Sequence, residues 1–194
     1  MENRVKQKKF VSLVLYLHNT QNEVVPFFQK VLPVFQDNFT NFEIVCVNDA
    51  CTDGTIGVLK EYLEENHCSE MVNIIHMSFF HGLESAMNAG RDLAIGDFIY
   101  EFDTAYVDYP SELIMEVYDK LLEGNDIVSA GTRDHVRMTS GFFYFCYNKT
   151  SRGRGKIGPE TFRIVSRRAI NRIKSIGQYI PCLLYTSPSP RDST

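Results

Sequence analysis

The sequence predicts an α/β fold with a mainly parallel central sheet and helices on both faces. Five short apolar segments alternate along the chain with segments in which apolar residues recur at helical spacing. This alternation is typical of βαβ units, in which a helix crosses over to the next parallel strand. The strand candidates are nearly continuous in apolar residues, as strands covered on both faces are. The 194 residues are enough for one domain with a sizeable core.

Polar or glycine-containing turns bound each strand candidate. The five candidates cover residues 10–17, 42–47, 71–77, 98–102 and 126–130. Helical spacing predicts helices at about 24–35, 55–63, 83–94 and 111–122, with a short helix at 166–170. Pro33 is expected to bend the first helix or end it early. Residues 131–159 break the pattern, and we predict no element there.

The composition argues against several classes of protein. A net charge of -4 with 23% charged residues gives no electrostatic footprint for nucleic acid. No apolar run approaches the roughly 20 residues of a membrane span. The five cysteines form no CxxC pair, so we expect reduced thiols in a cytoplasmic protein. Two basic segments, residues 4–9 and 149–156, are expected to be solvated surface, with contact to a membrane surface or a phosphate as the alternative.

Residues 182–194 differ in character from the rest of the chain. Their sequence resembles one reading frame of a transposase adapter used in sequencing libraries, and a disordered Ser/Pro tail is the alternative. We therefore expect a single domain over residues 1–181 with its core at about 9–172. The natural protein is expected to continue past Pro181.

Several polar residues and a glycine follow the predicted strands, where the carboxyl ends of parallel strands meet at one edge of the sheet. They are Asn19, Asn48, Asp49, Asp53, Gly82 and Asp103. Open α/β sheets bind ligands outside this edge. Asp49 can accept hydrogen bonds from a base or ribose, and Gly82 can let a phosphate approach the backbone at a helix N-terminus. Asp103 can hold a divalent cation, because Mg²⁺ is often bound by one or two carboxylates plus substrate phosphates.

Several segments also match the motifs of a known family in order and spacing. They are residues 11–19, which resemble a strand and its P-x-Y-N-E turn; 47–55, which resemble V-D-D-G-S-x-D-G-T; 78–82, at an S-R-N-x-G turn; 94–97, which resemble A-x-G-D; 102–110, over x-D-A-D-x-Q-D-P-P; 131–133, which resemble G-x-R; and 161–169, which resemble D-F-R-L-x-x-R-R. In these motifs the chain resembles the inverting nucleotide-sugar glycosyltransferases of family 2, and among them the branch that transfers sugars to polyprenyl phosphates.

The resemblance implies a GT-A-type three-layer sandwich that transfers a sugar from a nucleotide-diphospho-sugar to a lipid-phosphate or polysaccharide acceptor. The expected place of action is the cytoplasmic side of a membrane. The residues that it implies for binding the nucleotide-sugar are Leu17, Asn19, Asn48, Asp49, Gly82 and Asp103. Asp103 would also bind Mg²⁺ or Mn²⁺, and Glu160 is the candidate base for the acceptor.

The chain departs from the family pattern at several positions. The Arg-Asn pair of the third motif is Phe79-Phe80, the Glu of the first motif is Thr20, and the second Asp of the metal motif is Ala105. We expect Phe79 and Phe80 in the core or near lipid rather than as a stacking surface for a sugar. These losses leave a second hypothesis open, in which a degenerate GT-A domain acts as a binding or regulatory module. A Rossmann oxidoreductase is less well supported, because no GxGxxG follows the first strand.

Overall fold

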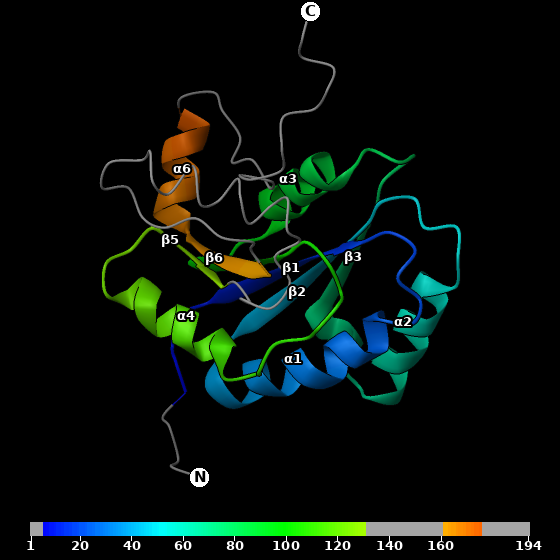
Figure 1. The fold of residues 1–194 in the computed structure, drawn as a ribbon, viewed down its shortest axis with the longest axis horizontal. Coiled ribbons are helices and arrows are strands. Elements are labelled where there is room, and N and C mark those ends of the chain that lie inside the picture. Colours follow the sequence, from blue (N-terminus) through cyan, green and yellow to red (C-terminus); the bar gives the residue numbers. More distant parts are fainter. Residues whose placement is uncertain (1–5, 131–160, 176–194) are drawn as a thin grey trace, which may run out of the picture.

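The computed structural model describes residues 6–130 and 161–175, which form a six-stranded sheet between two layers of helices (Figure 1). The strands are β1 (Val11–Leu17), β2 (Phe42–Asn48), β3 (Val72–His76), β4 (Phe98–Phe102), β5 (Ile127–Ala130) and β6 (Phe162–Ser166). The helices are α1 (Val24–Asn38), α2 (Thr55–Glu65), α3 (Leu83–Leu93), α4 (Leu113–Leu122) and α6 (Arg167–Ser175), with a short 3-10 turn η1 (Ser69–Met71).

The sheet is mainly parallel, as predicted. Its strand order is β3-β2-β1-β4-β6-β5, and β1 to β4 all run in the same direction. β6 is antiparallel to both of its neighbours, β4 and β5. The carboxyl ends of β1 to β4 therefore lie along one edge of the sheet, and the loops that follow them are neighbours.

An apolar cluster on each face of the sheet holds the three layers together. The larger cluster joins one face to α1, α2 and α4, and the smaller cluster joins the other face to α3 and α6 (Figure 1). Successive residues of β1 alternate between the clusters: Leu13 and Leu15 belong to the larger one and Val14 to the smaller. The predicted cover of helices on both faces is confirmed.

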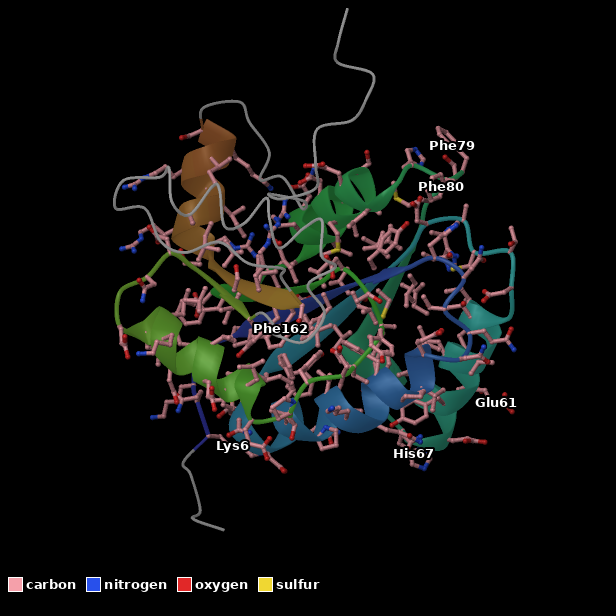
Figure 2. The ribbon with its side chains drawn as sticks, viewed as in Figure 1. Lys6, Glu61, His67, Phe79, Phe80 and Phe162 are labelled. Atoms are coloured by element: carbon pink, nitrogen blue, oxygen red, sulfur yellow. The ribbon has the colours of Figure 1, made fainter. Side chains whose placement is uncertain are left out.

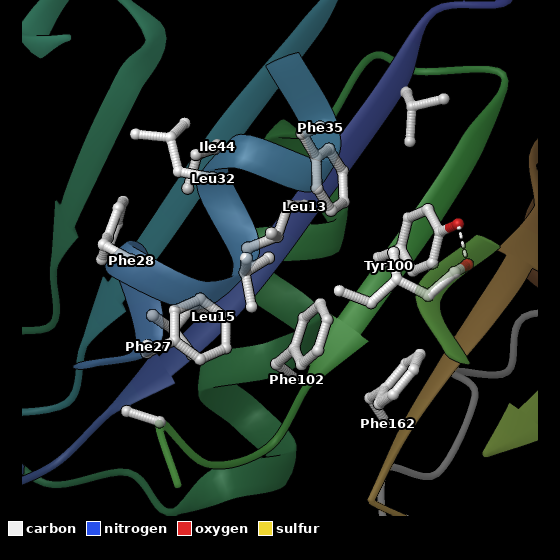
Figure 3. Packing of buried hydrophobic residues seen from close by; sticks show 14 of the residues in the cluster. Leu13, Leu15, Phe27, Phe28, Leu32, Phe35, Ile44, Tyr100, Phe102 and Phe162 are labelled. Carbon is white, nitrogen blue, oxygen red and sulfur yellow. Dashed lines mark hydrogen bonds between the residues drawn. The ribbon is translucent and has the colours of Figure 1, made fainter. Parts of the chain in front are cut away.

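Aromatic side chains in the larger cluster fix α1 and α4 against β4 (Figure 3). The ring centroids of Phe27 and Phe102 are 5.1 Å apart, as are those of Phe35 and Tyr100. The hydroxyl of Tyr100 donates a hydrogen bond of 2.7 Å to the carbonyl oxygen of Ile114 in α4. These contacts secure one face of β4 up to its last residue.

Pro33 was expected to bend α1 or to end it early; the early end is wrong, because the helix continues to Asn38, and a bend stays a prediction. Pro33 is exposed, whereas Val31, Leu32 and Phe35 are buried against the sheet. Packing on both sides of the proline holds the helix together. Water can bind the carbonyl group that the proline leaves without an intrahelical donor.

The C-terminal part of the sheet also differs from the prediction. Residues 162–166, for which no strand was predicted, form β6 between β4 and β5. The predicted fifth strand, β5, is therefore an edge strand that does not pair with β4. The helix expected at 166–170 begins at Arg167 and continues to Ser175.

Within residues 6–130 and 161–175, no helix combines the length and the apolar character that crossing a bilayer requires. The predicted tail at 182–194 lies outside the described residues.

Candidate functional site

Side-chain hydrogen bonds join the loops after β1 and β2 at the carboxyl edge of the sheet. Asn19, in the first loop, has a left-handed backbone with a φ of 54°. Its side-chain oxygen accepts hydrogen bonds from the backbone amides of Thr52 (2.8 Å) and Asp53 (3.3 Å). The Gln21 amide donates to the Asp53 carboxylate (3.1 Å), and the Gln21 side-chain oxygen accepts from the Gly54 amide (3.0 Å). The two loops therefore form one connected unit.

Leu17 and Asn48 shape this edge from inside the protein. Leu17 is fully buried, and its carbonyl oxygen accepts a hydrogen bond of 2.9 Å from the Asp49 amide. Asn48 is 8% exposed; its side-chain oxygen accepts from the Cys51 amide, and its side-chain nitrogen lies 2.9 Å from Nδ1 of His76. Contact of these two residues with a nucleotide-sugar stays a prediction.

The carboxylate of Asp49 is fully buried and accepts three hydrogen bonds. The backbone amides of His81 and Gly82 donate to Oδ1 (2.7 Å) and Oδ2 (2.8 Å), and the hydroxyl of Tyr16 donates to Oδ2 (3.1 Å). Burial, followed by this hydrogen bond to Asp49, raises the pKa of Tyr16, so its hydroxyl remains a donor. Asp49 thus ties the end of β2 to the turn that leads into α3.

The sequence did not single out Tyr16 as a member of the site. It is the one side chain in the otherwise aliphatic second half of β1 that carries a hydroxyl group. A buried tyrosine hydroxyl usually has a hydrogen-bond partner. A lone tyrosine in such a strand was therefore the available signal.

Gly82 precedes α3 in a conformation that suits glycine. Its φ is 85° and its ψ is 162°, and no atom lies within 4 Å of the position that a Cβ would occupy. The first amide groups of an α-helix have no acceptor within the helix, and the dipole places partial positive charge there. The expected position of Gly82 at a helix N-terminus is confirmed, while its contact with a phosphate stays a prediction.

Asp103 is the first residue after β4, and it is half-buried. Ala105, at the position of the second Asp in the metal motif, is fully buried in the larger apolar cluster. Among the residues that the structure describes, no three His, Cys, Asp or Glu side chains lie close enough together to hold a metal ion. Asp103 can supply one oxygen ligand, and diphosphate oxygens and water can supply the others. These residues fit an ion that arrives with a diphosphate rather than one held by the protein alone.

Of the two expected places for Phe79 and Phe80, the core is wrong, because their exposed fractions are 64% and 57%, and a place near lipid stays a prediction. Figure 2 shows both side chains projecting outward beside the segment that leads into α3. The Phe80 ring centroid lies 4.6 Å from that of His18, and Phe79 stacks on His81 at 3.9 Å. Nδ1 of His18 in turn lies 2.7 Å from the carbonyl oxygen of Asp49. The turn is anchored through its backbone, so these two aromatic side chains are left outside.

The predicted base, Glu160, lies outside the described residues, as does the G-x-R segment at 131–133. The structure therefore brings together, in the loops after β1 to β4, the residues predicted at 17–19, 48–53, 82 and 103.

Relatives of known sequence point in the same direction as the motifs. The chain is 32% identical over 174 residues to an uncharacterized glycosyltransferase of Synechocystis sp., a match that covers 86% of the chain and 53% of the relative. It is 30% identical over 173 residues to the bactoprenol glucosyl transferase of Shigella phage SfV, covering 84% of the chain and 54% of the relative. The chain thus spans about half the length of the curated relatives that it matches.

A solved structure confirms the fold. The mannosyltransferase PcManGT from Pyrobaculum calidifontis, in complex with GDP-Man and Mn²⁺, superimposes with a TM-score of 0.66 at 17% sequence identity. The match covers 90% of this chain and 48% of that protein. At this level of identity the likeness is one of fold.

The sequence model of glycosyl transferase family 2 matches residues 12–179, which include nearly all of the described sheet and helices. The motifs quoted from the sequence, the GT-A-type three-layer sandwich and the relatives agree with this match. The chain belongs to glycosyl transferase family 2.

Proposed function

We propose that this domain transfers a sugar from a nucleotide-diphospho-sugar to a lipid-phosphate acceptor, with a polysaccharide as the alternative acceptor. The observation that carries the proposal is the buried Asp49 carboxylate, which binds the amides of residues 81 and 82 and so fixes the start of α3. The amides of the first turn of α3, which follow Gly82, have no acceptor within the helix. A helix N-terminus fixed in this way is a suitable partner for a diphosphate. The names of the bactoprenol glucosyl transferases among the relatives support a polyprenyl phosphate acceptor.

In this proposal each residue has a separate task. Asp49 acts mainly by holding the turn before α3, while the exposed loop built on Asn19 lies where a base or ribose can bind. Asp103 supplies a ligand for Mg²⁺ or Mn²⁺. The metal, when bound, offsets the negative charge that develops on the leaving diphosphate. Glu160 is proposed to accept the proton of the attacking acceptor, and the domain is proposed to act at the cytoplasmic face of a membrane.

Calorimetric titration of the full chain with UDP- and GDP-sugars, with and without Mn²⁺, tests the donor. We expect one nucleotide to bind and Mn²⁺ to tighten its binding. Asp103→Ala should remove the effect of Mn²⁺ and leave most of the metal-free affinity, because the amides of the first turn of α3, after Gly82, remain. If no nucleotide-sugar binds with or without metal, the proposal is wrong.

A second candidate function is favoured by two observations. Ala105 is a core residue where the family has a metal-binding carboxylate, and Phe79 and Phe80 are exposed where it has a cation and an amide. A GT-A domain changed in this way can bind a nucleotide-sugar without transferring the sugar. Release of the nucleoside diphosphate over time separates the two candidates. Binding without any turnover, in the presence of polyprenyl phosphate and Mn²⁺, would favour the binding module.

A further inference from the structure

A buried carboxylate lies in β4, near the end of the strand that leads to the candidate site. Glu101, in β4, is 3% exposed, and each of its two oxygens accepts a hydrogen bond from a different arginine. Nε of Arg91, in α3, lies 2.5 Å from Oε1, and Nε of Arg163, in β6, lies 2.6 Å from Oε2. Both arginines are as buried as the carboxylate, and Arg91 also bonds to the side chain of Asn88.

Charged groups are rarely buried in this way. Removing charges from water is unfavourable, and well-packed apolar residues often serve stability equally well or better. Burial acts to raise the pKa of Glu101, but the charges of Arg91 and Arg163 outweigh burial and hold this pKa below its ordinary value. The hydrogen bonds from Arg91 and Arg163 to the two oxygens of Glu101 fix α3, β4 and β6 relative to one another.

Two of those elements, α3 and β4, lead to parts of the candidate site. α3 begins at the Gly82 turn, and β4 ends immediately before Asp103. Glu101 and Asp103 are two residues apart along the chain, with Phe102, the last residue of β4, between them. Arg163 is the direct partner of Glu101 in the β4–β6 register. On the opposite face, Phe102 packs in the larger apolar cluster. This packing limits rotation of the backbone at the end of β4.

We propose that Glu101 is a positioning residue for Asp103. This inference rests on the function proposed above. Held by Arg91 and Arg163, Glu101 fixes the end of β4 relative to α3. This sets the distance between the Asp103 carboxylate and the amides at the start of α3, between which a metal-diphosphate group binds. With Ala105 in place of the second Asp, Asp103 is the residue of this motif to which the resemblance assigns the metal, so its placement matters for metal binding.

Binding measurements with UDP and GDP, each with and without Mn²⁺, test this role. The main variant is the charge-free Arg91→Met/Glu101→Leu/Arg163→Met, which replaces the buried charges with apolar groups of similar size. Glu101→Asp, which keeps the charge but is one methylene shorter, is the second variant and carries the test if the triple variant does not fold. Changes to residues that orient metal ligands usually cost 10–100-fold in metal affinity. We expect the tightening by Mn²⁺ to fall by about tenfold in either variant, with metal-free affinity within about twofold of wild type.

The matched control is Asp126→Asn, which removes the negative charge from a carboxylate–arginine contact of 2.7 Å with Arg168 before β5. It should leave both affinities unchanged. A folded variant at Glu101 that keeps the full Mn²⁺ effect would overturn the inference, as would an equal loss with and without metal, which indicates a structural role alone. If the wild type binds neither nucleotide, the proposed function fails and takes this inference with it. If the wild type binds with a metal effect and the variants match it, this inference alone fails.

Discussion

Replacing Asp49 by asparagine should destabilise the protein far more than the small change in size suggests. In all three of its hydrogen bonds, at 2.7, 2.8 and 3.1 Å, the Asp49 carboxylate is the acceptor. The residue is fully buried, so water cannot replace a lost partner. Asparagine offers one oxygen and one NH₂ group, so its NH₂ must face at least one backbone amide. The less costly orientation keeps Gly82 and Tyr16 as donors and turns the NH₂ toward the His81 amide.

The expected cost follows from the bonds that are lost. A hydrogen bond to a charged group contributes about 1.5–3 kcal/mol, and an unsatisfied buried donor costs about 1–3 kcal/mol. Because these terms overlap, we expect Asp49→Asn to lower the free energy of unfolding by about 3 kcal/mol. For a domain of this size, that corresponds to a fall in melting temperature of about 6–12 °C. Urea denaturation and thermal scanning measure both quantities.

Asp53→Asn is the matched control. Asp53 is exposed and its carboxylate accepts hydrogen bonds from Thr55 and Gln21 in the same loops. Asparagine and aspartate serve almost equally well at the start of a helix, so this variant should lose less than about 1 kcal/mol. Equal losses in the two variants, or a loss below about 1 kcal/mol for Asp49→Asn, would show that the buried carboxylate does not hold the turn before α3.

Three further predictions concern other parts of the fold. Gly90→Ala should cost about 1–3 kcal/mol in urea denaturation, because its Cβ would lie 2.5 Å from Val14 Cγ1, whereas Gly57→Ala, with no atom within 4 Å, should stabilise α2 by about 0.5–1 kcal/mol. The hydrogen bonds from Arg168 and then Ser166 lower the pKa of Asp126. Its contribution to stability is therefore present above about pH 4 and lost as the pH falls through the lowered pKa, so the difference between wild type and Asp126→Asn in pH-dependent denaturation should shrink below about pH 4. Ala105→Asp should cost about 3 kcal/mol or more by placing a carboxylate in the apolar cluster, and recovery of this loss on adding Mn²⁺ would contradict that placement.

Most of the fold could be predicted because it depends on local patterns. The apolar runs and helical spacings identify β1 to β5 and α1 to α4 to within a few residues. The order of β5 and β6 depends instead on a pairing between distant segments. In β6, Arg163 interrupts the apolar pattern, and its burial is possible because Glu101, 62 residues earlier, accepts its hydrogen bond. A sequence read in short windows contains no signal for such a partner.

The candidate site was predictable in position but less so in detail. Parallel strands must place their carboxyl ends together, so the loops containing Asn19, Asp49 and Asp103 were expected at one edge. Which way each side chain faces depends on the three-dimensional arrangement of the donors around it. Asp49 turns inward because the amides before α3 and the Tyr16 hydroxyl surround it. Phe80 is exposed and its ring packs against His18, while the backbone amides of the two residues after it bond to Asp49.

Ala50 shows how the bend after β2 persists without the residue best suited to it. The family motif carries glycine here, yet Ala50 keeps a φ of 53°, a conformation that costs a residue with a Cβ about 1–2 kcal/mol. Its neighbours hold it in place, because the Asp49 amide bonds to the Leu17 carbonyl and the Cys51 amide bonds to the Asn48 side chain. The hydrogen bonds of Asp49 and Cys51 therefore maintain the bend of the backbone at Ala50. Residue 50 can therefore be alanine in place of glycine without loss of the bend after β2.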